Sequence, residues 1–198
     1  MNTSDVTFRI EPATPDRRGD IAAVINDCGD ASHCWCAFWS RPRAEFDRDW
    51  GDGNRRWFMR RLENATRPPG VLAYAGSLAA GWCAVAPRAE HSRLAASRNL
   101  APVDDTPVWS ITCFVVAKRF RRHGLMRALI DGASAFAAAH GARCVEAYPL
   151  DAARKLSSGE LYVGRLSTFQ AAGFVEVLRR APTRPIVRRD VSPACPRS

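Results

Sequence analysis

The chain has 198 residues, 46% of them hydrophobic, which is enough for a single domain with a large buried core. It contains no run of about 18 apolar residues, the length that a membrane-spanning helix needs. The first residues also lack the basic-then-apolar pattern of a signal peptide. We therefore expect one domain over residues 1–198, no membrane partner and a cytoplasmic location.

The chain is strongly basic, with a formal net charge of +9, and only two of its 29 basic residues are lysines. A basic chain could bind nucleic acid or a ligand that carries several phosphates. The preference for arginine, together with many alanines, is typical of a GC-rich genome, so we do not expect nucleic acid as a partner. The seven cysteines are irregularly spaced, which favours reduced thiols over a disulfide framework.

Apolar spacing predicts the elements of the N-terminal half. In chain order they are a strand over residues 6–10, a helix that begins at Thr14-Pro15 and carries Ile21, Val24, Ile25 and Cys28 on one face, a second helix capped by Asn54, and a hairpin over residues 71–86. Between the helices, residues 29–53 are expected to be irregular and aromatic. A polar connection is expected over residues 88–107.

Apolar spacing also predicts the elements of the C-terminal half. Its predicted elements are a strand over 108–116, a helix over 124–140 ended by Gly141, a strand over 142–150, a loop over 151–164, a short helix near 165–172, and a final pair of strands over 174–180 and 184–190. The whole order predicts a mixed α/β, or α+β, fold.

One turn in this half points to a ligand. The strand over 108–116 leads through Arg121-Arg122-His123-Gly124 into a helix. Backbone N–H groups at a helix N-terminus lack internal acceptors, the helix dipole is positive there, and glycine lets a ligand come close. The turn therefore suits a phosphate or pyrophosphate. The alternative is an ordinary turn with solvated arginines; the glycines of a dinucleotide fingerprint and the end of a P-loop are both missing.

The same turn resembles the acyl-CoA motif of the GNAT acetyltransferase superfamily, written Arg/Gln-x-x-Gly-x-Gly/Ala. It reads Arg121-Arg122-His123-Gly124-Leu125-Met126, so Met126 replaces a small residue. A second landmark, the aromatic-x-x-x-Gly-Phe that ends the family's next helix, matches Phe169 to Phe174. The resemblance implies a single GNAT domain with a central, mostly antiparallel sheet flanked by helices. Its fourth and fifth strands, here 108–116 and 143–149, would splay apart to admit the pantetheine arm of the cofactor.

The resemblance also implies which residues bind acetyl-CoA, the acyl donor. Backbone groups of Val115 and Val116 would pair with the pantetheine. The N–H groups of Arg121, Arg122, His123, Gly124, Leu125 and Met126 would hold the pyrophosphate, with the two arginines adding charge.

The catalytic groups are harder to assign, because transfer to an amine needs a proton acceptor for the amine and a proton donor for the departing thiolate. The positions that many family members use for these groups hold Thr112 and Phe169 here. Glu146, a charged residue in an apolar strand, is our candidate base, and a salt bridge to an arginine is its structural alternative. Tyr162 is our candidate acid, and simple packing is its alternative. A backbone N–H at Val115 or Val116 could stabilise the oxyanion.

The acceptor site is expected to involve the aromatic segment His33–Trp39, because in this family the segment after the first helix covers the acceptor. Trp35, Phe38 and Trp39 would wall an apolar pocket, with Glu90, His91 and Tyr148 as further candidates; an ordinary hydrophobic cluster is the alternative. Cys34 and Cys36 lack the second pair that a zinc site needs, so no metal is expected. Cys113, on the fourth strand, could carry the acyl group, but the family transfers it directly.

Two functions remain open at this point. The first is an acetyl-CoA-dependent N-acetyltransferase that moves an acetyl group directly to an amine of a small molecule or a protein. The second is an acyl-CoA-binding regulator or sensor of the same fold without turnover. The sequence leaves a homodimer open as the assembly, and it does not identify the acceptor.

Overall fold

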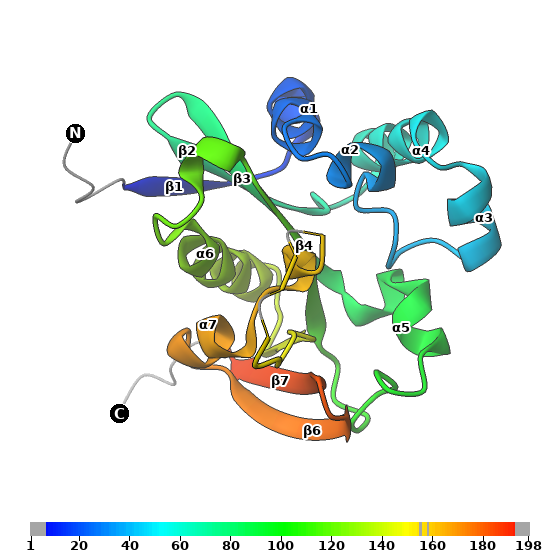
Figure 1. The fold of residues 1–198 in the computed structure, drawn as a ribbon, viewed down its shortest axis with the longest axis vertical. Coiled ribbons are helices and arrows are strands. Elements are labelled where there is room, and N and C mark those ends of the chain that lie inside the picture. The colour runs from blue at the N-terminus through cyan, green and yellow to red at the C-terminus, as the bar shows by residue number, and fades with distance from the viewer. Residues whose placement is uncertain (1–6, 155, 158, 193–198) are drawn as a thin grey trace.

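A seven-stranded sheet in the order β1-β2-β3-β4-β5-β7-β6 forms the centre of the computed structural model, which describes residues 7–154, 156–157 and 159–192 (Figure 1). The strands are β1 (Phe8–Pro12), β2 (Gly70–Ala75), β3 (Leu78–Pro87), β4 (Trp109–Val116), β5 (Cys144–Ala147), β6 (Val175–Ala181) and β7 (Arg184–Asp190). All neighbouring strands are antiparallel except β4 and β5, which are parallel. The fold is therefore mixed α/β with a mostly antiparallel sheet, as the sequence predicts.

The parallel pair is short. β4 and β5 pair over three residues only, from Trp109 opposite Val145 to Ile111 opposite Ala147. Just beyond, the register between β4 and β3 shifts and leaves Thr112 without a partner on β3. Such an extra residue bends a strand and increases its local twist. From Thr112 onward β4 follows β3, while its other edge has no strand partner among the described residues, so the predicted splay is present.

Helices cover both faces of the sheet (Figure 1). They are α1 (Arg18–Asn26), α2 (Ala31–Cys34), α3 (Arg43–Arg48), α4 (Asp52–Asn64), α5 (Ser92–Ala96), α6 (Leu125–Ala139) and α7 (Leu166–Ala171). α6 packs against β1 to β4 on one face, whereas α1 and α4 cover the opposite face. In the part of the chain that the structure describes, every helix is too short or too polar to cross a bilayer.

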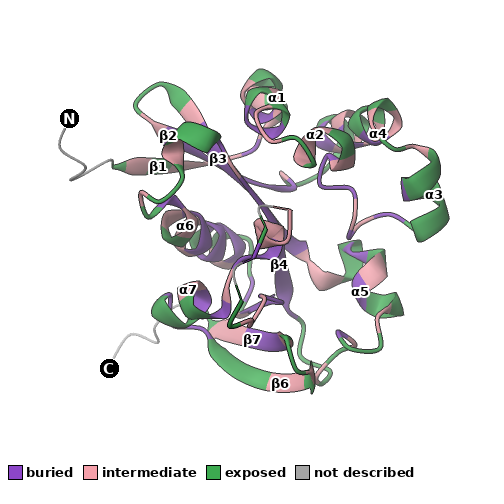
Figure 2. Cartoon of the chain, viewed as in Figure 1, coloured by how far each residue is buried: buried purple, intermediate pink, exposed green. Residues whose placement is uncertain are grey.

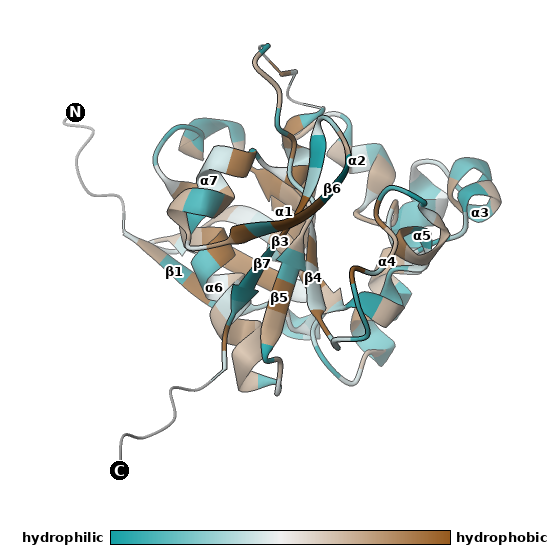
Figure 3. Ribbon diagram, turned by 90° about the horizontal axis from the view of Figure 1, so that it is seen from below, coloured by the Kyte–Doolittle hydropathy of each residue, from teal (hydrophilic) through white to brown (hydrophobic). Residues whose placement is uncertain are grey.

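The alternation of side chains along β4 connects the sheet to two hydrophobic clusters. Phe114 joins the cluster that contains Leu129 and Ile130 of α6, whereas Cys113 and Val115 join the cluster beneath α1 and α4. Figure 2 shows the buried face of α6 turned toward the strands and the largely exposed β6 at the sheet edge. In Figure 3 hydrophobic residues gather along the central strands and hydrophilic ones on the outlying helices. β4 therefore lies at the centre of the core, with a different environment on each face.

Most of the predicted elements are confirmed: the hairpin with its turn at Gly76, the central strand, helix α6 followed by Gly141 in the left-handed conformation, the short helix α7 and the final strand pair. The first strand lies two residues later than predicted and β5 is shorter. Positions 6, 158 and 195, which belong to the expected first strand, the loop and the set of cysteines, lie outside the described residues.

Two predictions about local structure are wrong, and one predicted connection contains a short helix. Residues 29–53 are not irregular, because the short helices α2 and α3 lie there, and the connection 88–107 contains α5. Asn54 does not cap α4, which begins at Asp52 after Gly51 in a left-handed conformation. Its buried side-chain amide instead accepts from Arg41 and donates to the carbonyl of Phe46. Helices of four to six residues are too short to show an apolar period, which is why the sequence pattern missed them.

Candidate functional site

A cavity of about 440 Å³ lies along the open edge of β4. Its walls come from five segments of the chain, namely residues 28–38, 46–50, 113–116, 121–126 and 159–162. The lining residues on β4 are Cys113, Phe114, Val115 and Val116, and those of the basic turn and α6 are Arg121 and Met126. The cavity therefore lies along the part of β4 that no longer pairs with β5.

The turn before α6 lies beside the cavity, which Arg121 and Met126 line. Gly124 precedes the first residue of α6 with φ of 77°, and Arg122 also has a positive φ, of 65°. Among the described residues, the backbone N–H groups from Arg122 to Met126 have no hydrogen-bond acceptor. A Cβ added at Gly124 would meet nothing within 4 Å, so the space in front of these groups is open. Five successive free donors at the positive end of a 15-residue helix form a cradle for an anion.

Arginine side chains add positive charge beside this cradle. Neither Arg121 nor Arg122 forms an ion pair with a described residue, and both are exposed. Arg121 directs its Nε toward the carbonyl of Val116, at 3.4 Å, and its Nη2 toward the sulfur of Cys28, at 3.5 Å. The guanidinium of Arg121 thus lies between the end of β4 and the basic turn, where an anion on the backbone donors would meet it.

The open edge of β4 supplies further backbone groups. The N–H of Ala117 donates to Ala80 at the end of β3, so by strand alternation the N–H of Val115 also points toward β3. The polar groups of Phe114 and Val116 then point the opposite way, to the open edge. The carbonyl of Val116 agrees, because it accepts from Cys28 and Arg121, which lie on the cavity side. Of the two valines predicted to pair with a ligand, Val116 offers its backbone and Val115 its side chain.

Tyr162 forms part of the cavity wall opposite β4. It belongs to the 3₁₀ turn Leu161–Val163, and its ring lies 6.2 Å from that of Phe38, which also lines the cavity. Burial raises the pKa of Tyr162 to about 12, although nearby Arg184 and Arg93 oppose the shift. The phenol therefore keeps its proton at neutral pH and is available as a proton donor.

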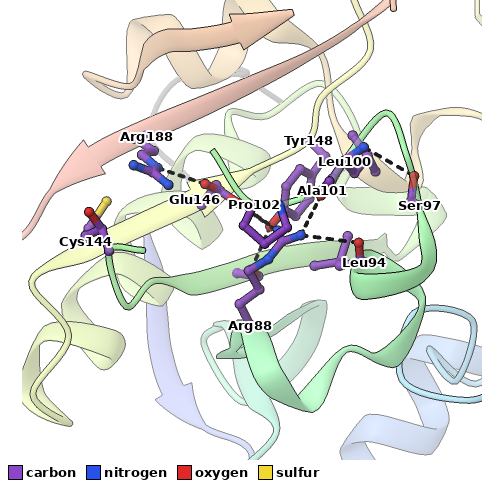
Figure 4. Close-up of polar contacts among 12 residues, drawn as sticks. Arg88, Leu94, Ser97, Leu100, Ala101, Pro102, Cys144, Glu146, Tyr148 and Arg188 are labelled. Carbon is purple, nitrogen blue, oxygen red and sulfur yellow. Dashed lines mark hydrogen bonds and ion pairs between the residues drawn. The ribbon is translucent and has the colours of Figure 1, made fainter. Parts of the chain in front are cut away.

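Glu146 has a different environment. It does not line the cavity, and its side chain is 1% exposed. Its Oε1 accepts from Arg88, at 2.9 Å, and from the hydroxyl of Tyr148, at 2.6 Å, while its Oε2 accepts from Nε of Arg188, at 2.8 Å (Figure 4). Arg188 also donates to the carboxylate of Asp104, and Arg88 donates to the carbonyls of Leu94 and Leu100. We refer to Arg88, Glu146, Tyr148 and Arg188 as the Glu146 network.

The remaining candidates for the acceptor site also divide into residues that line the cavity and residues that do not. Phe38 lines the cavity, but Trp35 and Trp39 do not; they are 2% and 8% exposed and belong to hydrophobic clusters. Glu90 lies on the surface and pairs with Arg61 and Arg67. Tyr148 belongs to the Glu146 network, and its hydroxyl also bonds to Ser110.

The sequence did not indicate several residues of the cavity wall. Cys28, Asp30, Phe46 and Trp50 line the cavity without having been candidates, and Cys34, Cys36 and Cys113, which were weighed only as zinc ligands or as an acyl carrier, line it as well. The alternation of Cys113 with Phe114 was a usable signal for the thiol on β4. Nothing local in the sequence could place α2 and α3 against that strand. Among the described residues, no group of three or more His, Cys, Asp or Glu side chains is arranged to hold a metal ion.

Comparisons with known proteins agree with this geometry. A sequence model of the acetyltransferase (GNAT) family matches residues 30–157, more than half of the chain. No curated protein sequence gives a significant match. Among solved structures, a GNAT-family acetyltransferase from Listeria monocytogenes has a TM-score of 0.58 at 13% identity, with 96% of this chain and 98% of that chain covered.

Two further structures are similar. A GNAT-family acetyltransferase from Streptococcus agalactiae has a TM-score of 0.55 at 12% identity, covering 92% of this chain and 95% of that one. The PaiA N-acetyltransferase from Thermoplasma acidophilum, in complex with coenzyme A, has a TM-score of 0.52 at 10% identity, covering 93% and 99%. At such identities the likeness establishes the fold, and the family model establishes the membership.

Proposed function

This chain belongs to the GNAT family of acetyltransferases, which implies acyl-CoA-dependent acetyl transfer, and we propose that it moves an acetyl group from acetyl-CoA directly to an amine. One observation carries the proposal. A single cavity runs from Arg121 and Met126, at the turn with five free backbone donors, along the open edge of β4 to Tyr162. In acetyl-CoA, the pyrophosphate needs backbone donors, the extended pantetheine arm needs an open strand edge, and the thioester at its end needs a proton donor.

Binding of acetyl-CoA follows from the cavity. The pyrophosphate lies on the N–H groups from Arg122 to Met126, beside Arg121. The pantetheine pairs with the open edge of β4, through the outward backbone groups of Val116 and Phe114. Met126 replaces the small residue of the family motif and lines the cavity, so its flexible side chain packs on the arm rather than blocking it.

The reaction then has two parts. The neutral amine attacks the thioester carbonyl, and an outward N–H of β4 stabilises the oxyanion that develops. As the tetrahedral intermediate collapses, Tyr162 gives its proton to the departing CoA thiolate. The raised pKa of Tyr162 ensures that this proton is present at neutral pH.

We assign no protein base to the amine. Glu146 is saturated by two arginines and a tyrosine and lies outside the cavity, so we infer a structural role for it. Asp30 is the only carboxylate among the described lining residues, and no imidazole lines the cavity. The amine therefore enters in its neutral form, and the proton of the intermediate passes to water. The apolar lining by Phe38 and Phe46 favours an acceptor with an apolar portion.

The direct test is a steady-state assay of CoA thiol release from acetyl-CoA with a panel of amines, with the acetylated product identified by mass spectrometry. We expect release that depends on the amine, with kcat/KM rising with pH up to the pKa of the acceptor. Tight binding of acetyl-CoA without release for any amine would instead support a regulator or sensor that binds acyl-CoA without turnover.

A further inference from the structure

Four thiols line the cavity, and two of them are in contact. The sulfur of Cys36, which follows α2, lies 3.2 Å from the sulfur of Cys113 on β4. These residues are 77 positions apart in the chain. Both side chains are buried, and both face the same cavity. The contact therefore joins the segment over the cavity to the strand beneath it.

The backbone holds Cys36 in an unfavourable conformation. Trp35 and Cys36 have φ of 47° and 49°, in the left-handed region that residues other than glycine rarely adopt. Such strain persists only where the surroundings impose it, and it is concentrated at functional sites. Here the Nε1 of Trp82 donates to the sulfur of Cys36 at 3.1 Å, and the sulfhydryl of Cys36 in turn donates to Cys113. A chain of hydrogen bonds thus fixes the position of the Cys36 sulfur.

The position of the Cys36–Cys113 pair along β4 determines which part of a bound CoA molecule it can contact. Val116 lies next to the basic turn, and Cys113 lies three residues further into the cavity, about 10 Å away for an extended strand. A CoA molecule with its pyrophosphate on the turn and its arm along β4 directs its sulfur toward Cys113. This step rests on the proposed function, because it takes the cavity as the CoA site.

We propose that Cys36 and Cys113 form a reversible redox pair that coenzyme A disulfide, bound in this cavity, oxidises to a Cys36–Cys113 disulfide. The pair reports the oxidation state of the CoA pool to the enzyme. The disulfide ties the segment after α2 to β4 at the inner end of the cavity, where the thioester has to lie. Acetyl transfer therefore stops in the oxidised form and returns on reduction.

The chemistry is two thiol–disulfide exchanges. The thiolate of Cys36, stabilised by the N–H of Trp82, attacks one sulfur of CoA disulfide, breaks the S–S bond and releases one CoA thiolate. The thiolate of Cys113 then attacks the Cys36 sulfur of the mixed disulfide and releases the second CoA thiolate. The two cysteines lose two electrons and two protons, and these convert one CoA disulfide into two CoA thiols.

The geometry of the two sulfurs agrees with this pairing. A disulfide bond is about 2.05 Å long, so the two sulfurs have to approach by only about 1 Å. Cys34 is the competing thiol of the same segment. Burial raises the pKa of Cys34, and the hydrogen bond with Cys36, followed by burial, raises the pKa of Cys113 as well. The pairing therefore rests on the 3.2 Å contact between the sulfurs of Cys36 and Cys113 and not on acidity.

Peptide mapping without reductant tests the proposal on the unmodified full chain. The reduced protein is incubated with CoA disulfide or with glutathione disulfide at equal concentration, quenched with a thiol-alkylating reagent, digested and analysed by mass spectrometry. We expect one cross-linked peptide pair, Cys36–Cys113, formed at least about tenfold faster with CoA disulfide because the cavity holds that reagent in place. Dithiothreitol should remove the cross-link and restore thiol release from acetyl-CoA.

Two variants serve as controls. Cys36→Ser should abolish the cross-link, whereas Cys144→Ser, a half-buried thiol of β5 outside the cavity, should leave it unchanged. No cross-link in the unmodified chain, or one dominated by Cys28 or Cys34, overturns the redox pair. Equal rates with the two reagents overturn the role of CoA disulfide. Calorimetric titration with CoA separates these failures from a failure of the proposed function, because an intact CoA site without a cross-link refutes only the redox pair.

Discussion

The Glu146 network and the cavity wall both bring polar side chains to β4 and its neighbours, but they differ in how far those side chains are satisfied. In the network, both oxygens of Glu146 are paired, and Arg88 and Arg188 bond to further acceptors. At the turn beside the cavity, the backbone donors from Arg122 to Met126 have no acceptor within the described residues, and Tyr162 lines the cavity itself. A charged residue inside an apolar strand is thus a weaker sign of function than unused hydrogen-bonding capacity beside a cavity.

The difference has an energetic side. Glu146 is buried between two partly buried arginines, and removing one member of such a set leaves an uncompensated charge in a largely dry site. The free backbone donors of the turn do not destabilise the fold when no ligand is bound, because water can hydrogen-bond to them at the exposed Gly124. Changes in the network should therefore act on stability, and changes in the cavity wall on binding and turnover.

The largest expected effect is on turnover. Tyr162→Phe removes the proposed proton donor and should lower kcat by roughly a hundredfold or more, as expected for loss of a general acid, with little change in acetyl-CoA affinity. Tyr148→Phe is the matched control, because it deletes a phenol of the network instead and should leave the kcat of the folded enzyme nearly unaltered. Equal losses of kcat in the two variants would contradict the claim that the cavity wall acts on turnover and the Glu146 network on stability.

Glu146→Gln should act mainly on stability. It leaves Arg88 and Arg188 without their shared carboxylate, and breaking a buried ion pair in this way typically costs about 3–5 kcal/mol. Urea unfolding measures the loss, and the assay is run at a temperature where the variant is folded. A hundredfold loss of kcat in a variant as stable as the parent would restore Glu146 as the catalytic base.

The aromatic segment offers a comparison inside one stretch of chain. Phe38→Ala should raise the acceptor KM by about tenfold, the value of one lost apolar contact of some 1.4 kcal/mol, because Phe38 lines the cavity. Trp39→Ala should instead destabilise the fold by about 3–5 kcal/mol with the acceptor KM unchanged, because Trp39 is buried with Leu94 and Tyr148. If Trp39→Ala instead raised the acceptor KM and Phe38→Ala only destabilised the fold, Trp39 would contact the acceptor, as the sequence suggests.

A further expected effect is a pH dependence of the free energy of unfolding, caused by a residue next to the network. Burial, together with Arg61 and Arg88, lowers the pKa of His91 to about 3, from about 6.5 when unfolded. Between these values only the unfolded chain takes up the proton, so stability falls as the pH drops below about 6.5. The slope is at most about 1.4 kcal/mol per pH unit. Urea unfolding at pH 7 and pH 5 should show a smaller loss in His91→Gln than in the parent; equal losses would mean that His91 titrates normally.

Much of the fold was predictable, because long elements carry clear periods. The hairpin, β4, α6 and the final strand pair could be read from spacing, and Gly124 marked the start of α6. The short helices α2 and α3 could not, and it is these that place Cys36 and Phe38 over β4. The turn Arg121–Met126 could be recognised because its motif lies in one short stretch of sequence, whereas the cavity wall is assembled from five separate segments.

The case of Glu146 shows the limit of inference from one residue. Its burial inside an apolar strand predicted either a catalytic base or an ion pair, and the partners that decide between them lie 58 residues before it and 42 after it. Thr112 illustrates the same limit for the backbone. Its bulge separates β4 from β5, but a bulge depends on the register with β3, which the local sequence does not encode.

The central claim is that the turn before α6 holds the pyrophosphate of CoA, and calorimetric titration of CoA into two glycine variants tests it most directly. Gly124 and Gly141 flank the two ends of α6, with φ of 77° and 85° and open space around a new Cβ. Replacing either by glutamate imposes a similar backbone strain. We expect Gly124→Glu to weaken CoA binding by at least about a hundredfold, roughly 2.7 kcal/mol, and Gly141→Glu to bind as the parent does. Equal affinity in all three proteins would contradict the account.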